Sequence, residues 1–210
     1  MRTERHLFDA VRERAQTSYQ AVIRPRLIDA VDGYGWAEEH AFMRTWMRPV
    51  SGPLLDIACG RGEHGRALAR WHGRRRVVAL DLDPMALAVA SRAKDAAHNS
   101  VVADVTALPI DDDACGGAIC FGGFAVFADP QTTLAEIARV LRHDAPLVLL
   151  SPRKSGSRLG RTAQRATTMR FYDDATWRAM LAEAGFGRPH VQGRGWTTLI
   201  AAKRARRART

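Results

Sequence analysis

The densest chemical pattern in the chain is LLDIACGRGEHG, residues 54–65, where three glycines follow the order G-x-G-x-x-G. Glycines at this spacing let the backbone turn tightly and approach a ligand closely. The helix expected to begin at Glu63 directs the positive end of its dipole toward an anionic group. The pattern is typical of a turn that binds a nucleotide, but by itself it does not say which nucleotide.

Three aspartates, each near the end of an expected strand, narrow the choice. Asp56 precedes Gly60 by four residues, and a carboxylate there suits an ammonium group better than a pyrophosphate. Asp81 ends RVVALD, where a carboxylate can accept hydrogen bonds from both hydroxyls of a ribose. Asp104 is placed to accept from an adenine amino group, with Val105 as an apolar neighbour. A dinucleotide site does not need this order of three acids, so the pattern argues against one.

The elements that must position these residues alternate along the chain from Pro53 onward. We expect helices over 63–71, 84–93, 130–141 and 174–184, and strands over 53–57, 76–81, 100–104, 116–121, 146–151, 190–193 and 196–203. This alternation is typical of an α/β fold in which helices cover a mostly parallel sheet. Ligands of such sheets bind at the carboxyl ends of the strands, where the three aspartates fall.

A chain of 210 residues is long enough for one sizeable core. We expect N-terminal helices over 1–50 that cap the site, one α/β domain over 51–203 and a basic tail over 204–210. No segment has the length and apolarity of a membrane span, and the first residues lack a secretory pattern. Three cysteines without a C-x-x-C pair indicate reduced thiols rather than a disulfide framework or a metal site. These features predict a cytoplasmic protein without a membrane contact.

The formal net charge of +10 raises the question of a nucleic-acid partner. Most of the excess lies at the two ends, because residues 1–26 hold six basic and three acidic residues, and residues 203–210 hold five basic residues and no acidic one. A tail of this kind is usually solvated and binds weakly. The charge distribution therefore argues against specific recognition of nucleic acid.

Seven segments, in family order, resemble the class I S-adenosylmethionine-dependent methyltransferases, and in particular the small-molecule branch with quinone-biosynthesis and natural-product enzymes. They are LLDIACGRG, VVALDLDPMAL, ADVTALPIDDD, DPQTTLAEIARVLR, PLVLLSPR, FYDDATWRAMLAEAGF and GRGWTTLIAAKR. The resemblance implies a Rossmann-like three-layer sandwich whose seven-stranded sheet has the order 3-2-1-4-5-7-6, with the last strand antiparallel. It implies S-adenosylmethionine as the cofactor, and transfer of a methyl group to an oxygen or carbon of a small molecule.

The resemblance also assigns cofactor contacts. At the strand ends these are Asp56, Ala58, Gly60, Gly62, Asp81, Leu82, Asp104, Val105 and Cys120. Tyr19 and Arg24 resemble a leading segment that folds over the cofactor in relatives. Each residue also has an alternative interpretation, because aspartates often cap helices or stabilise turns and a cysteine often fills a core.

The segment CFGGFAVFADP, after the fourth expected strand, departs from the family. Phe124 and Ala125 stand where many relatives place a histidine, so this segment offers the substrate an apolar wall, with Phe124 as the predicted contact, and no base. A base is needed only if the acceptor must lose a proton. The candidates are His64, in the first turn after the glycines, and His40, on a helix expected to cover the pocket.

Residues 152–170, which we expect to form a loop, hold six basic side chains and no acidic one. A solvated loop is one interpretation. The other is that the loop lies over the pocket and attracts an anionic acceptor, such as a carboxylate or a phosphate ester. Arg153 is then the first candidate for substrate binding, because it leaves the fifth strand on the ligand side.

Two other functions stay open. An RNA or DNA methyltransferase is disfavoured because the fourth strand is not followed by the Asn/Asp-Pro-Pro-aromatic motif of amino-group enzymes, and no proline precedes Cys120. A non-catalytic protein that binds S-adenosylmethionine is compatible with the apolar CFGGFAVF segment, and fold alone does not exclude it. The acceptor and the oligomeric state are not encoded in any of these motifs.

Overall fold

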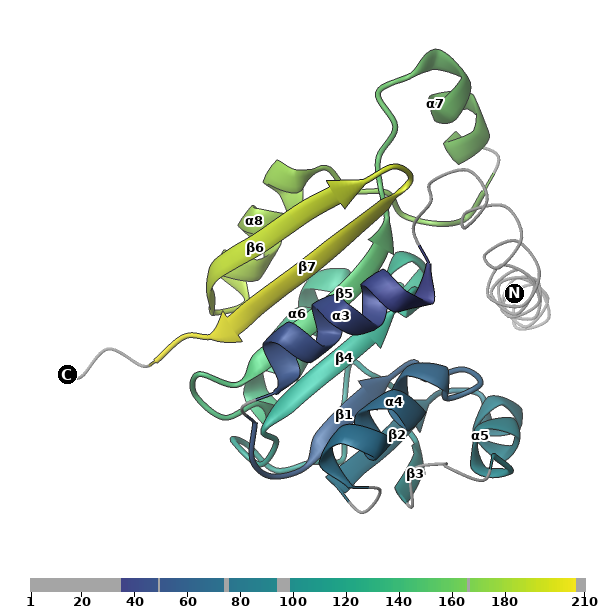
Figure 1. Ribbon diagram of the computed structural model, residues 1–210. Coiled ribbons are helices and arrows are strands. Elements are labelled where there is room, and N and C mark those ends of the chain that lie inside the picture. The colour runs from purple at the N-terminus through teal and green to yellow at the C-terminus, as the bar shows by residue number, and fades with distance from the viewer. Residues whose placement is uncertain (1–34, 49, 74–75, 94–98, 166, 207–210) are drawn as a thin grey trace, which may run out of the picture.

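The computed structural model describes residues 35–48, 50–73, 76–93, 99–165 and 167–206. Within them a seven-stranded sheet has the order β3-β2-β1-β4-β5-β7-β6 (Figure 1). The strands are β1 Leu54–Ile57, β2 Val77–Asp81, β3 Asn99–Val102, β4 Gly117–Phe121, β5 Pro146–Pro152, β6 Phe186–Arg194 and β7 Thr197–Arg204.

Strands β1 to β5 pair in parallel, and β7 is antiparallel to both β5 and β6. The expected strand order and the antiparallel last strand are therefore confirmed. All the parallel strands end at the same edge of the sheet, so that residues from distant parts of the sequence meet there.

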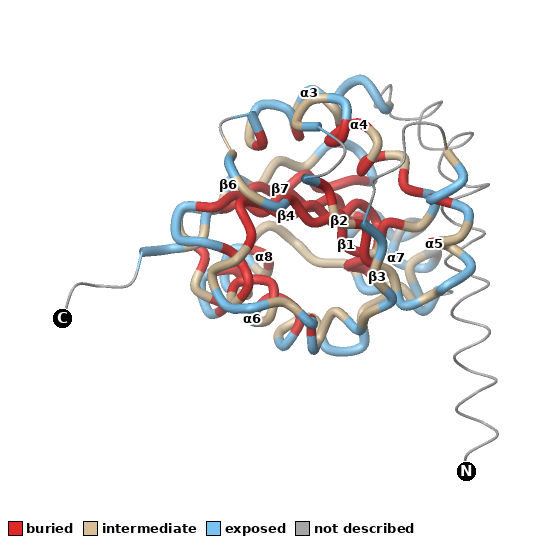
Figure 2. Tube along the Cα trace, turned by 90° about the horizontal axis from the view of Figure 1, so that it is seen from below, coloured by how far each residue is buried: buried red, intermediate tan, exposed pale blue. Residues whose placement is uncertain are grey.

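Helices cover both faces of the sheet, as Figure 2 shows by the buried strands between two helical layers. The helices α3 Trp36–Met47 and α4 Glu63–His72 lie on one face, and α6 Pro130–Val140 and α8 Asp174–Glu183 lie on the other. The short helix α5 Pro84–Ser91 packs on β2 and β3. The three-layer α/β sandwich that the sequence predicts is confirmed.

Capping residues define where the helices on the second face begin. The Asp129 side chain accepts a hydrogen bond from the Thr132 amide at 3.0 Å, and Pro130 occupies the first turn of α6. Asp173 caps α8 in the same way, through the Thr176 amide at 2.9 Å.

The core consists of two main apolar clusters, one on each face of the sheet. Strand β5 contributes to both because its side chains alternate: Leu147 and Leu149 face α6 and α8, whereas Val148 and Leu150 face α3. Burial on both faces explains why this strand is apolar from Pro146 to Leu150 rather than alternating in polarity.

Two expectations about secondary structure were wrong. The segment 152–170 is not a continuous loop, because Arg158–Arg165 forms the helix α7, which projects from the sheet in Figure 1. Its sequence RLGRTAQR is rich in good helix formers. Strand β6 begins at Phe186 rather than at residue 190, because β6 is an edge strand and tolerates Pro189 and a register shift between Gly187 and His190.

The N-terminal cap is described in part. Helix α3 falls within the expected helical segment 1–50, whereas Tyr19 and Arg24 lie outside the described residues. The boundaries at residues 51 and 203 stay predictions. Across the part of the chain that is described, no helix is long and apolar enough to cross a membrane.

Candidate functional site

A cavity of about 640 Å³ lies at the carboxyl ends of β1, β2 and β3. The loop after β4 and the first turn of α6 form its opposite wall. Five of the residues that the sequence predicts as cofactor contacts line the cavity: Ala58, Asp81, Leu82, Asp104 and Val105. The parallel order of the first three strands brings them together.

The Asp81 carboxylate, at the end of β2, holds the glycine turn against the cavity. The Gly60 amide donates to Asp81 Oδ2 at 2.8 Å, and the Asp83 amide donates to Asp81 Oδ1 at 3.0 Å. Each carboxylate oxygen can accept more than one hydrogen bond. A fixed carboxylate with both oxygens at a cavity wall is suited to the two hydroxyls of a ribose.

Asp104 follows β3 and is also held by its neighbours. The Thr106 amide and hydroxyl donate to Asp104 Oδ1 at 2.8 Å and 2.7 Å. The backbone bond and then the side-chain bond hold the pKa of Asp104 below its usual value. Asp104 is thus a carboxylate acceptor near neutral pH, and Oδ2 is not used in either of these bonds.

The opposite wall comes from residues whose role the sequence analysis missed. Val126 and Phe127 give it an apolar surface, and Asp129 and Thr133 give it polar groups. The short 3₁₀ helix Gly123–Val126 brings this wall close to β1, because a Cβ atom on Gly123 would lie only 2.5 Å from the Cβ of Ala58. The Asp129-Pro130 pair signalled a helix start in the sequence, but nothing showed that this start faces a cavity.

A partly buried ion pair supports the loop that carries Asp104. Glu136 Oε1 accepts from the Leu108 amide at 2.7 Å, and Arg139 pairs with Glu136 at 2.7 Å. The Arg139 guanidinium also donates to the Ile110 carbonyl at 2.8 Å. Helix α6 therefore fixes the wall that follows β3, although neither charged side chain lines the cavity.

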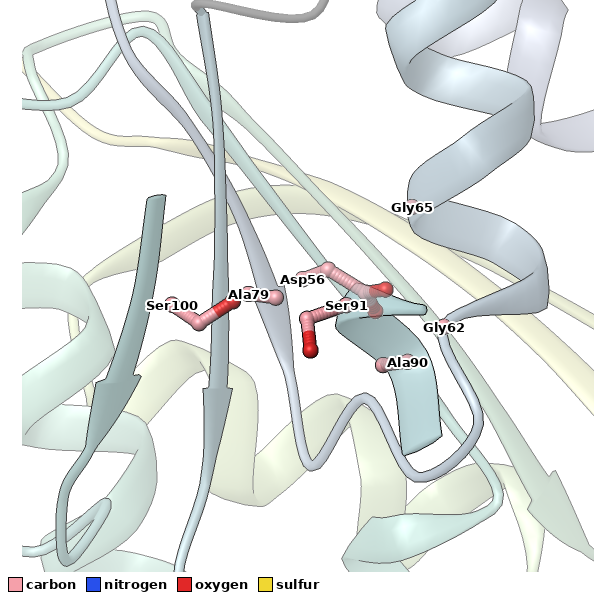
Figure 3. Close-up of a pocket in the computed structure, with 7 residues that line it drawn as sticks. All are labelled: Asp56, Gly62, Gly65, Ala79, Ala90, Ser91 and Ser100. Atoms are coloured by element: carbon pink, nitrogen blue, oxygen red, sulfur yellow. The ribbon is translucent and has the colours of Figure 1, made fainter. Parts of the chain in front are cut away.

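Asp56 lies in a different environment from Asp81. Its side chain is buried and lines a separate cavity of about 10 Å³ together with Gly62 and Gly65, and Figure 3 shows these lining residues. A Cβ atom on Gly65 would lie 2.5 Å from Asp56 Oδ2, so only glycine fits there without a shift. Burial raises the pKa of Asp56 to about 7. Its predicted contact with an ammonium group stays a prediction.

The other two glycines of the turn, Gly60 and Gly62, have structural roles. Gly60 donates its amide to Asp81, and Gly62 begins α4 with a φ of +74°. A Cβ atom on Gly62 would lie 3.0 Å from the Cβ of Ala90 on α5. Positive φ and close packing both favour glycine here. Neither residue is among those that line the larger cavity, so their cofactor contacts stay predictions.

The two candidate histidines lie together on the α3 side of the sheet. His64 is buried, and its Nε2 lies 3.0 Å from Glu39 Oε2. His40 packs edge-on against the His64 ring, with 5.7 Å between the ring centroids. Neither histidine lines the larger cavity. Glu39 was missed because a glutamate on a helix near the N-terminus usually points to solvent.

Cys120 and Phe124 are part of the core. Cys120 is fully buried at the end of β4, and burial raises the pKa of its thiol. Phe124 is also fully buried, and its ring lies 4.8 Å from that of Trp177 on α8. Val126 and Phe127 line the cavity where Phe124 was expected to do so. The predicted ligand contacts of Cys120 and Phe124 stay untested.

Arg153 lies beside the β6–β7 hairpin. Its amide donates to the Trp196 carbonyl at 2.7 Å, and its guanidinium packs on Gly193. One guanidinium nitrogen lies 3.9 Å from Asp174 Oδ1. Arg153 is about 40% exposed and is not among the residues that line the larger cavity. Its position after β5 is as expected, and its role in substrate binding stays a prediction.

The residues that line the cavity suit S-adenosylmethionine, because they offer hydrogen-bond acceptors and apolar surface. Asp81 and Asp104 supply hydrogen-bond acceptors for a ribose and an adenine amino group, and Leu82 and Phe127 supply apolar surface for a purine ring. Leu82 is 69% exposed, so its side chain is open to a ligand in the cavity. Four carboxylates line the cavity, from Asp81, Asp83, Asp104 and Asp129, and their field favours a positively charged ligand.

The fold and the cavity together define a class I methyltransferase architecture, and the comparisons agree. Residues 55–149 match the family model described as a methyltransferase domain. Over this segment, which is less than half of the chain, the sequence is similar to a methyltransferase domain. The resemblance that the sequence motifs indicated is confirmed, and so is the class of cofactor that it implied.

Two relatives with curated names align with this chain over 100 and 114 residues. The chain is 36% identical over 100 residues to demethylmenaquinone methyltransferase of Thermus thermophilus, a match that covers 46% of each chain. It is 30% identical over 114 residues to demethylmenaquinone methyltransferase of Chlamydia felis, a match that covers 53% of this chain and 50% of that protein. The match thus spans about half the length of these curated relatives.

A solved structure extends the likeness beyond the matched domain. Geranyl diphosphate C-methyltransferase of Streptomyces coelicolor, in complex with Mg²⁺, geranyl diphosphate and S-adenosyl-L-homocysteine, has a TM-score of 0.68 and 16% sequence identity. The likeness covers 80% of this chain and 77% of that one. At this identity the likeness concerns the fold.

Proposed function

We propose that this protein transfers the methyl group of S-adenosylmethionine to an oxygen or carbon of a small-molecule acceptor. The observation that carries the proposal is the cavity of about 640 Å³, which gathers Asp81, Leu82 and Asp104 at the ends of adjacent parallel strands. S-adenosylmethionine supplies a methyl group on a positively charged sulfur. The residues of the chain bind and orient the reactants.

Each cavity residue has a defined task in this proposal. Asp81 accepts from the ribose hydroxyls, and Asp104 accepts from the adenine amino group beside Val105. Leu82 and Phe127 cover the two faces of the purine. The glycine turn and Asp56 lie toward the methionine end, where a carboxylate favours the ammonium group. Tyr19 and Arg24 belong to the segment that we propose covers this end.

The acceptor is the less defined partner. Methyl transfer from a sulfonium is an in-line displacement, so most of the catalysis comes from holding the acceptor and the methyl group in line in a dry site. The names of the relatives support a small acceptor: demethylmenaquinone in two cases and geranyl diphosphate in another. We propose a small acceptor rather than RNA or DNA.

An anionic acceptor is part of the proposal. Arg153, Arg158 and Arg165 follow β5, and no acidic residue lies between positions 152 and 170. Positive charge near a site raises the local concentration of an anionic substrate. Replacing Arg153 with Ala is expected to raise KM for such an acceptor and to weaken its salt dependence, whereas Arg178→Ala, at an exposed position of α8, is the control. Unchanged KM in both variants would exclude this role.

We also propose that the protein acts in the cytoplasm. Cys59, Cys115 and Cys120 are free and buried among the described residues. Free thiols are typical of a reducing compartment. Fractionation of cells that express the native chain, with an antibody against it, tests the location.

Thermal unfolding with S-adenosylhomocysteine, and separately with NAD, tests the cofactor. A ligand at a hundredfold excess over its dissociation constant adds about 2.7 kcal/mol, which raises the midpoint of a domain this size by roughly 5–10 °C. We expect a shift with S-adenosylhomocysteine alone, and no such shift in the Asp81→Ala variant. The control is Asp111→Ala, an exposed aspartate outside the cavity lining. A shift with NAD alone would contradict the proposal.

A further inference from the structure

Arg170 lies in the segment between α7 and α8 and donates hydrogen bonds to the loop after β4. Its backbone amide donates to the Ala125 carbonyl at 2.7 Å. Its guanidinium donates through Nε to the Phe127 carbonyl at 3.1 Å and through Nη2 to the Ala128 carbonyl at 2.8 Å. Phe127 and Ala128 line the larger cavity, whereas Arg170 is not among its lining residues. The side chain therefore acts on the cavity wall from outside the cavity.

The wall after β4 has a weak hydrogen-bond pattern of its own. Gly122 has a φ of +85° and joins β4 to the 3₁₀ helix Gly123–Val126. The bond that ends this helix, from the Phe127 amide to the Phe124 carbonyl, is long at 3.4 Å. A 3₁₀ helix has poorer hydrogen-bond geometry than an α-helix, and carbonyls at a helix end need partners from elsewhere. The Arg170 guanidinium supplies such partners to this wall.

A guanidinium suits two neighbouring carbonyls better than an ammonium does. Its N–H groups form a rigid planar fork, so one side chain can hold two acceptors at once in a fixed geometry. Arg139 acts in a similar way on the opposite wall, where it donates to the Leu108 carbonyl at 3.1 Å and to the Ile110 carbonyl at 2.8 Å. An arginine therefore holds the backbone of each cavity wall.

The backbone next to Arg170 is fixed to the sheet. Tyr172 forms a parallel bridge with Arg153, and its carbonyl accepts from the Lys154 amide at 3.2 Å. The Tyr172 ring packs edge-on against Trp177 of α8, with 5.2 Å between the ring centroids. Because Arg170 lies two residues before Tyr172, its side chain starts from a point that is fixed relative to β5 and α8.

We infer that Arg170 is a positioning residue for cofactor binding, which holds the wall after β4 where Phe127 lies against the purine. This inference rests on the proposed function. Arg170 contributes through Phe127 and Ala128 rather than by touching the cofactor or the reacting atoms. Its side chain is exposed, so water can replace it at the two carbonyls. Loss of the side chain therefore changes the position of the wall more than the overall stability.

The size of the effect follows from the fraction of molecules whose wall is correctly placed. The apparent dissociation constant of a ligand rises by the inverse of that fraction. A wall in place about a tenth of the time weakens binding about tenfold, which is the effect expected of Arg170→Ala on S-adenosylhomocysteine. Arg170→Lys keeps the charge but not the fork, so we expect a smaller loss of about threefold.

Calorimetry with two ligands separates position from charge. S-adenosylmethionine carries a positive sulfonium, and S-adenosylhomocysteine does not. Removal of a nearby positive charge by itself favours the sulfonium ligand and leaves the other nearly unchanged, whereas a misplaced wall weakens both ligands by nearly the same factor. Arg178→Ala is the matched control, because Arg178 is an exposed arginine that donates to the Pro189 carbonyl at 2.8 Å and is not among the cavity-lining residues.

Hydrogen exchange of the ligand-free protein tests the position of the wall without any turnover. We expect the amides of residues 121–129 to exchange faster in Arg170→Ala than in the wild type or in Arg178→Ala, and S-adenosylhomocysteine to restore their protection. The amides of β1 and β5 are expected to exchange as in the wild type, which shows that the variant is folded. Should Arg170→Ala not fold, Arg170→Lys is judged by the same measurements.

The outcomes separate this inference from the proposed function. No binding of S-adenosylhomocysteine to the wild type contradicts the proposed function and the inference with it. Affinity in Arg170→Ala within about twofold of that in Arg178→Ala overturns the inference alone, because the wall then stays in place without the side chain. Weaker binding with unchanged exchange over 121–129 also overturns it, because the effect does not then pass through the wall. In these two cases the methyltransferase proposal stands.

Discussion

The carboxyl ends of β1 and β2 lie side by side and each carries an aspartate, yet the two aspartates have opposite environments. Asp81 is the last residue of β2 and lines the large cavity, where two backbone amides hold its carboxylate. Asp56 stands one residue before the end of β1 and lies buried beneath Gly65. Burial raises the pKa of Asp56 to about 7. One position along a strand therefore separates a cavity-lining carboxylate from a buried acid.

The lesson is that the first turn of α4 covers β1 but leaves the end of β2 open. Gly62 and Gly65 let this turn approach the sheet, and Asp56 is enclosed as a result. The first turn of α4 does not cover Asp81. The Asp81 carboxylate instead holds the glycine turn by accepting a hydrogen bond from the Gly60 amide. The following predictions test this contrast, from the largest expected effect to the smallest.

Replacing Asp56 with Asn is expected to change the pH dependence of folding most strongly. The folded-state pKa of about 7 lies above the ordinary value of 3.8, so the folded protein binds a proton that the unfolded chain has lost. Stability of the wild type therefore falls as pH rises from about 4 to about 7, and the Asn variant is spared this loss. Above pH 7 the wild type has lost about 4 kcal/mol of folding stability that the Asn variant keeps. Urea unfolding of both proteins at pH 4 to 8 measures it.

The contrast between Asp56 and Asp81 would not hold if the cofactor also contacts Asp56. An ammonium group next to Asp56 favours the ionised carboxylate, so binding at pH 6.5 would then release a proton. Calorimetry in two buffers of different ionisation enthalpy detects that release. No release would assign Asp56 to the packing beneath α4 rather than to the ligand.

Replacing Asp81 with Asn is expected to weaken S-adenosylhomocysteine binding at least about 100-fold. The variant loses the charge that strengthens hydrogen bonds to ribose hydroxyls, and each such bond contributes about 1.5–3 kcal/mol. Isothermal calorimetry measures the affinity. The matched variant Asp111→Asn changes the same group at an exposed site outside the cavity lining. Equal affinity in both variants would remove Asp81 from the binding site.

Replacing Gly65 with Ala is expected to lower stability by about 1–3 kcal/mol, because the added Cβ meets Asp56 Oδ2 at 2.5 Å. In the double variant with Asp56→Ala much of this loss should disappear. The control is Gly156→Ala, where φ is not positive and no atom lies within 4 Å of the added Cβ. Denaturant unfolding of the four proteins forms the cycle. Additive losses would show that the two residues do not compete for space.

Replacing Asp104 with Asn is expected to weaken S-adenosylhomocysteine binding about tenfold. Asp104 is expected to accept from one adenine amino group, whereas Asp81 is expected to accept from two ribose hydroxyls, so the loss at Asp104 should be smaller. A competition assay with adenosine and with S-adenosylhomocysteine shows whether the loss belongs to the nucleoside end. A loss larger than that of Asp81→Asn would reverse the order of the two contacts.

Much of the fold follows from local patterns. Asp129-Pro130 starts α6 and the alternating apolar runs give the strands, because caps and periodicity act over a few residues. The sequence also placed Asp81, Leu82 and Asp104 correctly at the strand ends that form the cavity. It did not reveal Phe127 and Asp129 on the opposite wall, because their position depends on how β4 and α6 pack against β1.

The sequence by itself indicated an α/β domain with a nucleotide-binding turn, because spacing within a strand–turn–helix unit is local chemistry. Its resemblance to a methyltransferase family implied the strand order and the type of cofactor. The tertiary structure alone decided which polar groups meet across the fold. It paired Glu39 with His64, it moved Phe124 into the core, and it enclosed Asp56 while leaving Asp81 open. The physical reason is that burial and long-range contacts depend on how helices pack on the sheet, and no short segment of the chain carries that information.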